Sequence, residues 1–390
     1  MKMERIYMDN AATTATDPKV FAAMEPYFTK VYGNPSSFHS FGREAREAVK
    51  EARDKVAQLI GAAESKEIVF TSGGTEADNY AIKGVAEELK DEGKHIITSA
   101  IEHHAVLHAC EYLEDKGFEV TYLPVDEDGL VDPKAVADAI REDTILITIM
   151  LANNEVGTIQ PIAEIGEIAK ENDITFHTDA VQAVGTIPVD VNQLNVDLLS
   201  LSGHKFHSPK GIGALYIRQG TKIEKYLHGG AQEDGRRATT ENVAGIVGLG
   251  KAAEIAEQGL VEKDKKLTKL RDRLIDGLAA EIDEIKLNGH RTKRLPGNVN
   301  FSIRYIEGES ILMKLDLAGI AASSGSACTS GSLEASHVLL AMGLSAEVAH
   351  GSLRLSLSKY NTEEEIDKVI NVLPKVVSDL RAMSPIYNQK

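Results

Sequence analysis

The sequence predicts an α/β protein in which a mostly parallel seven-stranded sheet is covered by helices, with a smaller α+β domain after it. Two observations carry this prediction. Short apolar runs of strand length recur through the first two-thirds of the chain, and amphipathic stretches lie between many of them. The chain also has 390 residues, which is enough for a large core and for two domains.

The apolar runs are expected to be the strands of the large sheet, because strands buried on both faces read as nearly continuous apolar segments. They are EIVFT (67–71), HIITSA (95–100), FEVTYLPV (118–125), TILITIML (144–151), ITFHTDA (174–180), VDLLSLS (196–202) and IGALYIR (212–218). Ligands of such sheets collect at the carboxyl ends of the strands, so chemistry is sought there.

The helices are predicted from apolar spacing and from their end signals. Pro18 stands where a helix begins. Residues 40–61 carry apolar side chains at i+3 and i+4 spacing, with Ser40 as the expected N-cap and Gly61 as the stop. One long charged helix is expected around 241–285.

Three segments are predicted to make up the domain organisation. Residues 1–15 pack with the small domain, 16–258 form the large domain, and 259–390 form the small domain. GNVNFSIRY and GSLRLSLSKY supply strands of the small domain, and a last helix follows Thr362, which stands in capping-box spacing with Glu365.

Composition excludes several classes of function. The net charge of −16 and the absence of Trp argue against a nucleic-acid partner. The sequence has no apolar run of about 18 residues, so no membrane span is expected. The start has no stretch typical of a signal peptide, and the two cysteines lie far apart, as in a reducing compartment. We therefore expect a cytoplasmic protein.

The segment SLSGHKFHSPKGIGALYIR places Lys205 just after a predicted strand, beside Ser202 and His204. A lone lysine is most often a surface residue. At this place in a parallel sheet, however, its amine could form a Schiff base with pyridoxal 5′-phosphate, and its neighbours could bind phosphate.

That cofactor needs further residues, and other strand ends supply candidates. Asp179 could hold the ring nitrogen protonated, although it could instead be a helix N-cap, and Gln182 could reach the ring hydroxyl. The turn with Gly74 and Thr75 opens a helix and could bind an anion. His103 could stack on the ring, or be an ordinary polar turn residue. No metal site is expected, because His103 and His104 diverge and no ligand cluster joins them.

The two cysteines have different surroundings. Cys110 lies on an apolar helical face, where core packing is expected. Cys328 lies in AASSGSACTSGSLEASHVLL, whose small residues predict a mobile loop at about 321–335.

Together these motifs resemble the cysteine desulfurases of the NifS/IscS type, within the class V aminotransferase superfamily of fold-type I enzymes. The resemblance rests on YMDNAATT, YGNPSSFHSFG, TSGGTEADN, EHHAV, NNEVGTIQPI, HTDAVQAVG, SGHKFHSPKGIGALY, SGSACTSGSLEASHVLLAMG and LRLSLSKYNTEEEID, and it covers nearly the whole chain.

The resemblance implies a role for each matching residue. Lys205 would carry pyridoxal 5′-phosphate and move protons, and His103 would stack on its ring as acid and base. Asp179 would pair with the ring nitrogen and Gln182 with the ring oxygen. The phosphate would be bound by Gly74, Thr75, Ser202 and His204, and by Thr240 of the second subunit of a homodimer. Asn154 and Arg354 would bind the carboxylate of L-cysteine.

Cys328 would be the nucleophile that takes the substrate sulfur as a persulfide, with alanine as the other product. The sulfur would pass to an iron–sulfur scaffold or another acceptor protein, and Cys328 could also ligate an iron–sulfur cluster transiently. Two alternatives stay open: a selenocysteine lyase or other class V enzyme, which would not need Cys328, and a non-catalytic sulfur-carrier or scaffold protein.

Overall fold

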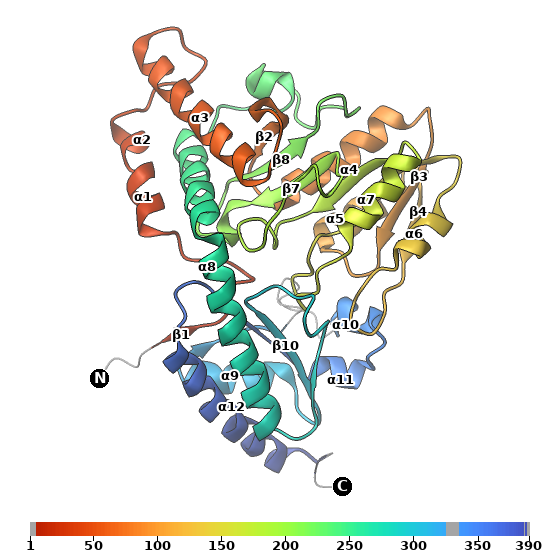
Figure 1. The fold of residues 1–390 in the computed structure, drawn as a ribbon, viewed down its shortest axis with the longest axis vertical. Coiled ribbons are helices and arrows are strands. Elements are labelled where there is room, and N and C mark those ends of the chain that lie inside the picture. The colour runs from red at the N-terminus through yellow and green to blue at the C-terminus, as the bar shows by residue number, and fades with distance from the viewer. Residues whose placement is uncertain (1–4, 325–334, 386, 388–390) are drawn as a thin grey trace.

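The computed structural model describes residues 5–324, 335–385 and 387 (Figure 1). In the described part of the chain, the backbone forms a large lobe around a seven-stranded sheet and a smaller lobe around a three-stranded one. One long helix, α8, runs from the first lobe into the second.

The large sheet has the strand order β2-β8-β7-β6-β5-β3-β4. Its strands are β2 (Ile68–Thr71), β3 (His95–Ser99), β4 (Glu119–Leu123), β5 (Thr144–Thr148), β6 (Thr175–Asp179), β7 (Leu198–Ser202) and β8 (Gly213–Ile217). Each of them lies within one of the seven apolar runs, so the prediction of a seven-stranded sheet is confirmed.

Only β8 breaks the parallel arrangement of this sheet. It pairs antiparallel with both β2 and β7, whereas β7, β6, β5, β3 and β4 pair parallel along the row. Since β2 and β7 both oppose β8, they run in the same direction. The carboxyl ends of six strands therefore meet at one edge of the sheet.

Alternate residues of each strand enter two separate apolar layers. In β2, Ile68 and Phe70 pack into one layer and Val69 into the other. The first layer is completed by α1 (Pro18–Met24), α3 (Ser40–Leu59), α6 (Pro133–Ala139), α7 (Ile162–Glu171) and the first half of α8 (Val243–Glu281). The second is completed by α4 (Gly74–Leu89) and α5 (His104–Glu114). Helices thus cover both faces.

The small sheet has the order β12-β10-β9, all antiparallel. Its strands are β9 (Ile285–Leu287), β10 (Asn298–Ile303) and β12 (Ser352–Ser356). The core on it includes α9 (Gly308–Leu317), α12 (Glu363–Met383) and the second half of α8. The remaining elements are α2 (Pro26–Thr29), α10 (His337–Ala341) and α11 (Ala346–His350).

The start of the described chain belongs to this second core. β1 (Ile6–Tyr7) pairs parallel with β11 (Ile320–Ala321), and Ile6 and Met8 are buried in the small-lobe core. Residues near position 10 thus lie beside residues near position 356. On these contacts we propose the division into 1–15, 16–258 and 259–390.

α8 is a 39-residue helix that contributes to both cores. Ile246 and Leu249 pack in the large lobe, and Leu270 and Leu274 pack in the small one. Close contact with α3 requires Gly250, because a Cβ there would lie 2.5 Å from the Cα of Ala52. The predicted long helix is confirmed.

The observed helix ends agree with the sequence signals, with one exception. Pro18 begins α1, and the Thr362–Glu365 capping box begins α12. Gly61, at φ +67°, follows the end of α3 as expected. The predicted N-cap Ser40 is wrong: His39 is the cap, and its Nδ1 accepts the N–H of Gly42 at 3.3 Å. An imidazole nitrogen satisfies the same free N–H that a hydroxyl would.

Candidate active site

The sheet topology brings the predicted site residues to one edge. Gly74 and Thr75 follow β2, His103 follows β3, Asn154 follows β5, Asp179 ends β6, and Ser202 and Lys205 end and follow β7. These strands all run toward the same edge, as shown above. The structure therefore gathers segments that are up to about a third of the chain apart.

Lys205 lies in a 3₁₀ turn, Gly203–Lys205, directly after β7. Its Nζ donates to the carbonyls of Ala11 at 2.5 Å and Ala12 at 3.0 Å. Thr14 donates from both its N–H and its hydroxyl to the His204 carbonyl, at 3.0 and 2.9 Å. These hydrogen bonds hold the N-terminal segment against the turn that carries Lys205.

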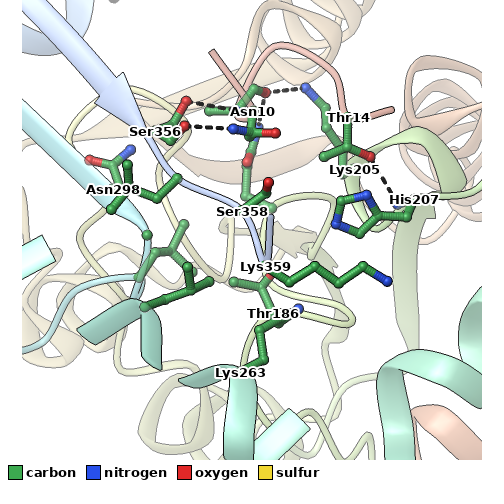
Figure 2. A pocket seen from close by; sticks show the side chains of 16 residues that line it. Asn10, Thr14, Thr186, Lys205, His207, Lys263, Asn298, Ser356, Ser358 and Lys359 are labelled. Atoms are coloured by element: carbon green, nitrogen blue, oxygen red, sulfur yellow. Dashed lines mark hydrogen bonds between the residues drawn. The ribbon is translucent and has the colours of Figure 1, made fainter. Parts of the chain in front are cut away.

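A cavity of about 50 Å³ lies beside this contact, between residues of the two lobes (Figure 2). Asn10 donates to the Ser356 carbonyl at 2.8 Å, and the N–H of Ala11 donates to the Ser356 hydroxyl at 2.8 Å. Figure 2 shows Lys205 bonded to the same N-terminal segment from the opposite side. The small lobe therefore helps to position the segment that contacts Lys205.

The turn before α4 has the form of an anion cradle. A Cβ at Gly74 would lie 2.6 Å from Cγ2 of Val181, and one at Gly73 would point toward the Ser202 hydroxyl, 3.7 Å away. Glycine at both positions keeps this space clear. The free N–H groups and the dipole at the start of the 16-residue α4 favour an anion there, with the Thr75 and Ser202 hydroxyls nearby.

Asp179 is buried, and its Oδ1 accepts the N–H of Val181 at 2.8 Å. Burial raises the pKa of this carboxyl to about 6, while the Val181 hydrogen bond and the Lys205 charge oppose part of that shift. The carboxyl therefore caps the following turn, as one of the two predictions for this residue had it, and its contact with a ring nitrogen stays a prediction. Gln182 donates from Nε2 to the Ala11 carbonyl at 3.0 Å.

His103 caps α5, with its Nδ1 accepting the N–H of Ala105 at 3.1 Å. Burial, followed by the Lys205 charge, lowers the pKa of His103 to about 4. A neutral ring whose Nδ1 accepts must carry its proton on Nε2. His204 is held similarly neutral, since burial and Lys205 lower its pKa to about 4.

A second layer of polar side chains lies under Asp179, and sequence reasoning missed it. His177 hydrogen-bonds with the Thr148 hydroxyl at 2.8 Å and the Ser200 hydroxyl at 3.0 Å, and its Nε2 is 3.7 Å from Oδ1 of Asp78. That Oδ1 has no hydrogen-bond partner among the described residues. Burial, and then the charge of Asp179, raise the pKa of Asp78 well above its ordinary range.

Glu102 is a third buried carboxyl near the site. It accepts the Ser99 hydroxyl at 2.6 Å and the N–H of Met150 at 3.0 Å. Burial raises its pKa from 4.5 to about 8, although both hydrogen bonds oppose the shift. Of Asp179 and Glu102, Asp179 therefore has the lower pKa and ionises more readily.

Glu102→Gln is expected to change how stability depends on pH. Between about pH 4.5 and 8 the folded protein keeps a proton on Glu102 that the unfolded chain has released. Unfolding therefore becomes easier as pH rises, by up to about 1.4 kcal/mol per pH unit for one group. Glutamine cannot titrate, so the variant should gain stability relative to wild type as pH rises through this window.

Chemical denaturation at several pH values measures that difference. Asp78, Asp179 and the buried histidines titrate in both proteins. Their contribution to the pH dependence of stability therefore largely cancels when the two proteins are compared. Glu127→Gln, at an exposed position, is the matched control and should follow wild type. A difference that stays constant from pH 5 to pH 8 would contradict the assignment of a proton to Glu102.

Arg354 enters the site from β12 of the small lobe and is 3% exposed. Its Nη1 donates to the Asn154 carbonyl at 3.0 Å, and its Nη2 donates to Oδ1 of Asp9 at 3.1 Å. Its Nε has no hydrogen-bond partner among the described residues. Nη1 and Nη2 each carry a second N–H, so the guanidinium keeps donors for a further acceptor, as binding of a carboxylate requires.

The structure does not bring every predicted residue together. Cys328 lies outside the described residues. Thr240 is exposed and lines a separate pocket of about 210 Å³ with Thr71 and Ser72. Cys110 is buried in the core, as predicted, and burial raises the pKa of its thiol. The residues that sequence reasoning missed are Asp9, the Ala11 and Ala12 carbonyls, Asp78, Glu102 and His177.

These side chains fit pyridoxal 5′-phosphate. The cleared turn at Gly73 and Gly74 suits a phosphate, the buried Asp179 suits a protonated ring nitrogen, and Lys205 supplies an amine. Among the described residues, no His, Cys, Asp and Glu side chains are grouped to hold a metal ion. Within the same ranges, none of the helices is long and apolar enough to cross a membrane.

Comparisons with known proteins show the family of the chain. A family model for class V aminotransferases matches residues 6–369. The chain is 61% identical over 381 residues to a protein named Cysteine desulfurase IscS from Methanosarcina thermophila, covering 98% of this chain and 94% of that protein. It is 57% identical over 390 residues to the protein of the same name from Dictyoglomus turgidum, covering 100% and 98%.

Solved structures show the same fold. A structure described as a NifS-like protein has a TM-score of 0.91 and 42% identity, covering 97% of this chain and 100% of that one. Another, described as SspA in complex with cysteine, has a TM-score of 0.81 and 38% identity, covering 92% and 100%.

Proposed function

The chain belongs to the class V aminotransferase family, and on that premise we propose that it is a cysteine desulfurase dependent on pyridoxal 5′-phosphate. The observation that carries the proposal is the convergence of three groups on one sheet edge. They are the Lys205 amine, the buried Asp179 carboxyl and the Arg354 guanidinium. The match with proteins of that name over nearly the full chain supports the same activity.

The chain's own side chains would hold the cofactor. The start of α4 with Gly74 and Thr75, together with Ser202 and His204, would bind its phosphate. Asp179 would pair with the ring nitrogen, Gln182 would lie by the ring oxygen, and His103 would cover the ring. When bound, the cofactor supplies an electron sink that stabilises negative charge on the substrate carbons.

Three residues would then act on the substrate. Arg354 would bind the α-carboxylate of L-cysteine through the second N–H groups of its Nη atoms, next to the Asn154 segment. Lys205 would move the proton at the α-carbon. His103, neutral at pH 7 with its proton on Nε2, is suited to donate and accept a proton.

Cys328 would receive the sulfur. Its thiolate attacks the sulfur of L-cysteine, the carbon–sulfur bond breaks, and the electron pair stays with the substrate carbon, which takes up a proton. The products are a persulfide on Cys328 and L-alanine, and no outside oxidant or reductant is needed. The persulfide would then pass its sulfur to an iron–sulfur scaffold or another acceptor protein in the cytoplasm.

We expect a homodimer in which Thr240 reaches the phosphate site of the second subunit. Thr240 is exposed on this chain, which fits this role. Several aromatic side chains between positions 21 and 41 are also exposed on this chain, and a second copy could cover them. They are Phe21, Phe28, Tyr32, Phe38 and Phe41. Sedimentation would separate a dimer from a monomer of 42.2 kDa.

The proposed activity predicts equal amounts of two products. Purified protein loaded with pyridoxal 5′-phosphate and given L-cysteine with a thiol reductant should release L-alanine and sulfide in a one-to-one ratio. Amino-acid analysis and a sulfide assay measure both. Release from L-selenocysteine alone would favour a selenocysteine lyase, and a colourless protein that takes up no cofactor would favour a non-catalytic sulfur carrier.

A further inference from the structure

A second cavity, of about 100 Å³, lies between α1, α8 and the turns that follow β6 and β7. Three of its polar lining residues, His207, Lys263 and Lys359, also line the cavity drawn in Figure 2, so the polar groups lie where the two cavities adjoin. The rest of the wall is mostly apolar and includes Val20, Phe206, Ala252, Ile255 and Ala256. The cavity therefore joins an apolar space to a polar side.

This polar side carries more positive than negative charge. Among the described residues that line the cavity, Asp17 is the only carboxylate, and it already accepts the Lys359 amine and the Tyr360 hydroxyl, the latter at 2.9 Å. Nδ1 of His207 donates to the Ala15 carbonyl at 2.9 Å, and burial lowers the pKa of this ring to about 4, so it is neutral at pH 7. Two lysines and one carboxylate leave one positive charge in excess.

Lys263 is the cation that lacks a counter-charge. Its Nζ donates to the Gly185 carbonyl, and within the described ranges the ion pair at this place joins Asp17 to Lys359 and does not include Lys263. Burial, followed by the charge of Lys359, lowers the pKa of Lys263 to about 8, and Asp264 offsets only part of this shift. A charged amine in apolar surroundings without a carboxylate is costly, and an anion beside Nζ would remove that cost.

The size and polarity of the cavity narrow the class of ligand. An inorganic anion would neutralise Lys263 but leave the apolar part unfilled, whereas a hydrocarbon would fill the apolar part but leave the charge. An apolar cavity of about 150 Å³ in another protein holds benzene, so a cavity of about 100 Å³ has room for a chain of a few carbons. One negative charge on that chain would match the one positive charge in excess.

We propose that this cavity binds short-chain aliphatic monocarboxylates, with the carboxylate against Lys263 and the hydrocarbon chain along Val20, Phe206 and Ile255. Lys359 comes from the small lobe and Phe206 from the large one, so the ligand would contact both lobes. None of the residues that line the cavity has a role in the proposed desulfurase reaction, and the two proposals therefore succeed or fail separately.

Isothermal titration calorimetry of the cofactor-loaded protein with butyrate tests the site. Acetate lacks two methylene groups and 1-butanol lacks the charge, so butyrate should bind about tenfold more tightly than either. Lys263→Met keeps an apolar side chain of similar length but removes the amine, and it should weaken butyrate binding at least about tenfold. Lys265→Met, at an exposed position two residues later on α8, is the matched control and should bind butyrate as wild type does.

Gly259→Leu tests the apolar part and leaves Lys263 in place. A Cβ at Gly259 meets nothing within 4 Å, so a leucine has room to fill the cavity, and the affinity for butyrate should fall to that for acetate. Wild type that binds no butyrate would overturn the proposal. So would equal affinity in wild type and Lys263→Met, since the carboxylate would then bind elsewhere, such as at Arg354. If Gly259→Leu binds butyrate as tightly as wild type, the chain does not occupy the cavity and the proposal is wrong.

Discussion

Lys205→Ala is expected to abolish covalent attachment of pyridoxal 5′-phosphate and to lower kcat by roughly 10⁴-fold, because both the amine and the proton carrier are lost. The protein should lose the yellow absorbance of the attached cofactor. Spectra of the purified variant, with borohydride reduction to trap any attached cofactor, measure this directly. Turnover with L-cysteine gives the change in rate.

The variant also loses the hydrogen bonds of Nζ to the Ala11 and Ala12 carbonyls, so folding has to be checked. Lys205→Arg keeps a cationic donor but cannot form the attachment, and it should be equally colourless. Lys210→Ala, at an exposed position five residues later, is the matched control and should stay yellow and active. A yellow, borohydride-trapped Lys205→Ala protein would exclude this lysine as the attachment site.

Cys328→Ala is expected to keep the bound cofactor and its colour but to lower desulfurisation at least about 100-fold, since the nucleophile is gone. Incubation with sulfur-labelled L-cysteine should leave label on wild-type protein and none on the variant. Alanine analysis on the same samples measures turnover.

The only other cysteine provides the control. Cys110→Ala removes a thiol that is buried between α4 and α5, away from any proposed chemistry. It should cost about 1–2 kcal/mol of stability from the small cavity while leaving sulfur labelling intact. Full desulfurisation by Cys328→Ala would overturn the sulfur-transfer step and favour another class V reaction.

Much of the large lobe could be predicted because its signals are local. Each strand of the sheet is an apolar run bounded by polar residues, and Gly61 and the Thr362 capping box mark helix ends within a few positions. Lys205, Asp179 and His103 could be found because the carboxyl ends of parallel strands share one edge. The residues that contact them from neighbouring elements could not be found in this way.

The missed contacts depend on distances along the chain that no local pattern reveals. Asp9 and Arg354 are 345 positions apart, and Asp78 faces His177 from a different element. On a helix, Asp78 looks like an ordinary polar residue until the packing of α4 buries it. The apolar pattern also did not reveal that β8 runs antiparallel, because its sequence is as apolar as that of its parallel neighbours.

The pairing of β1 with β11, and of Asn10 with Ser356, has a consequence for biosynthesis. As the chain leaves the ribosome, its first strand emerges more than 300 residues before its partners are made. The sheet of the large lobe can assemble before the partners of these first residues have been made. The segment that supports Lys205 is held on both sides only after Ser356 has been made, so a product truncated before that residue would lack this support.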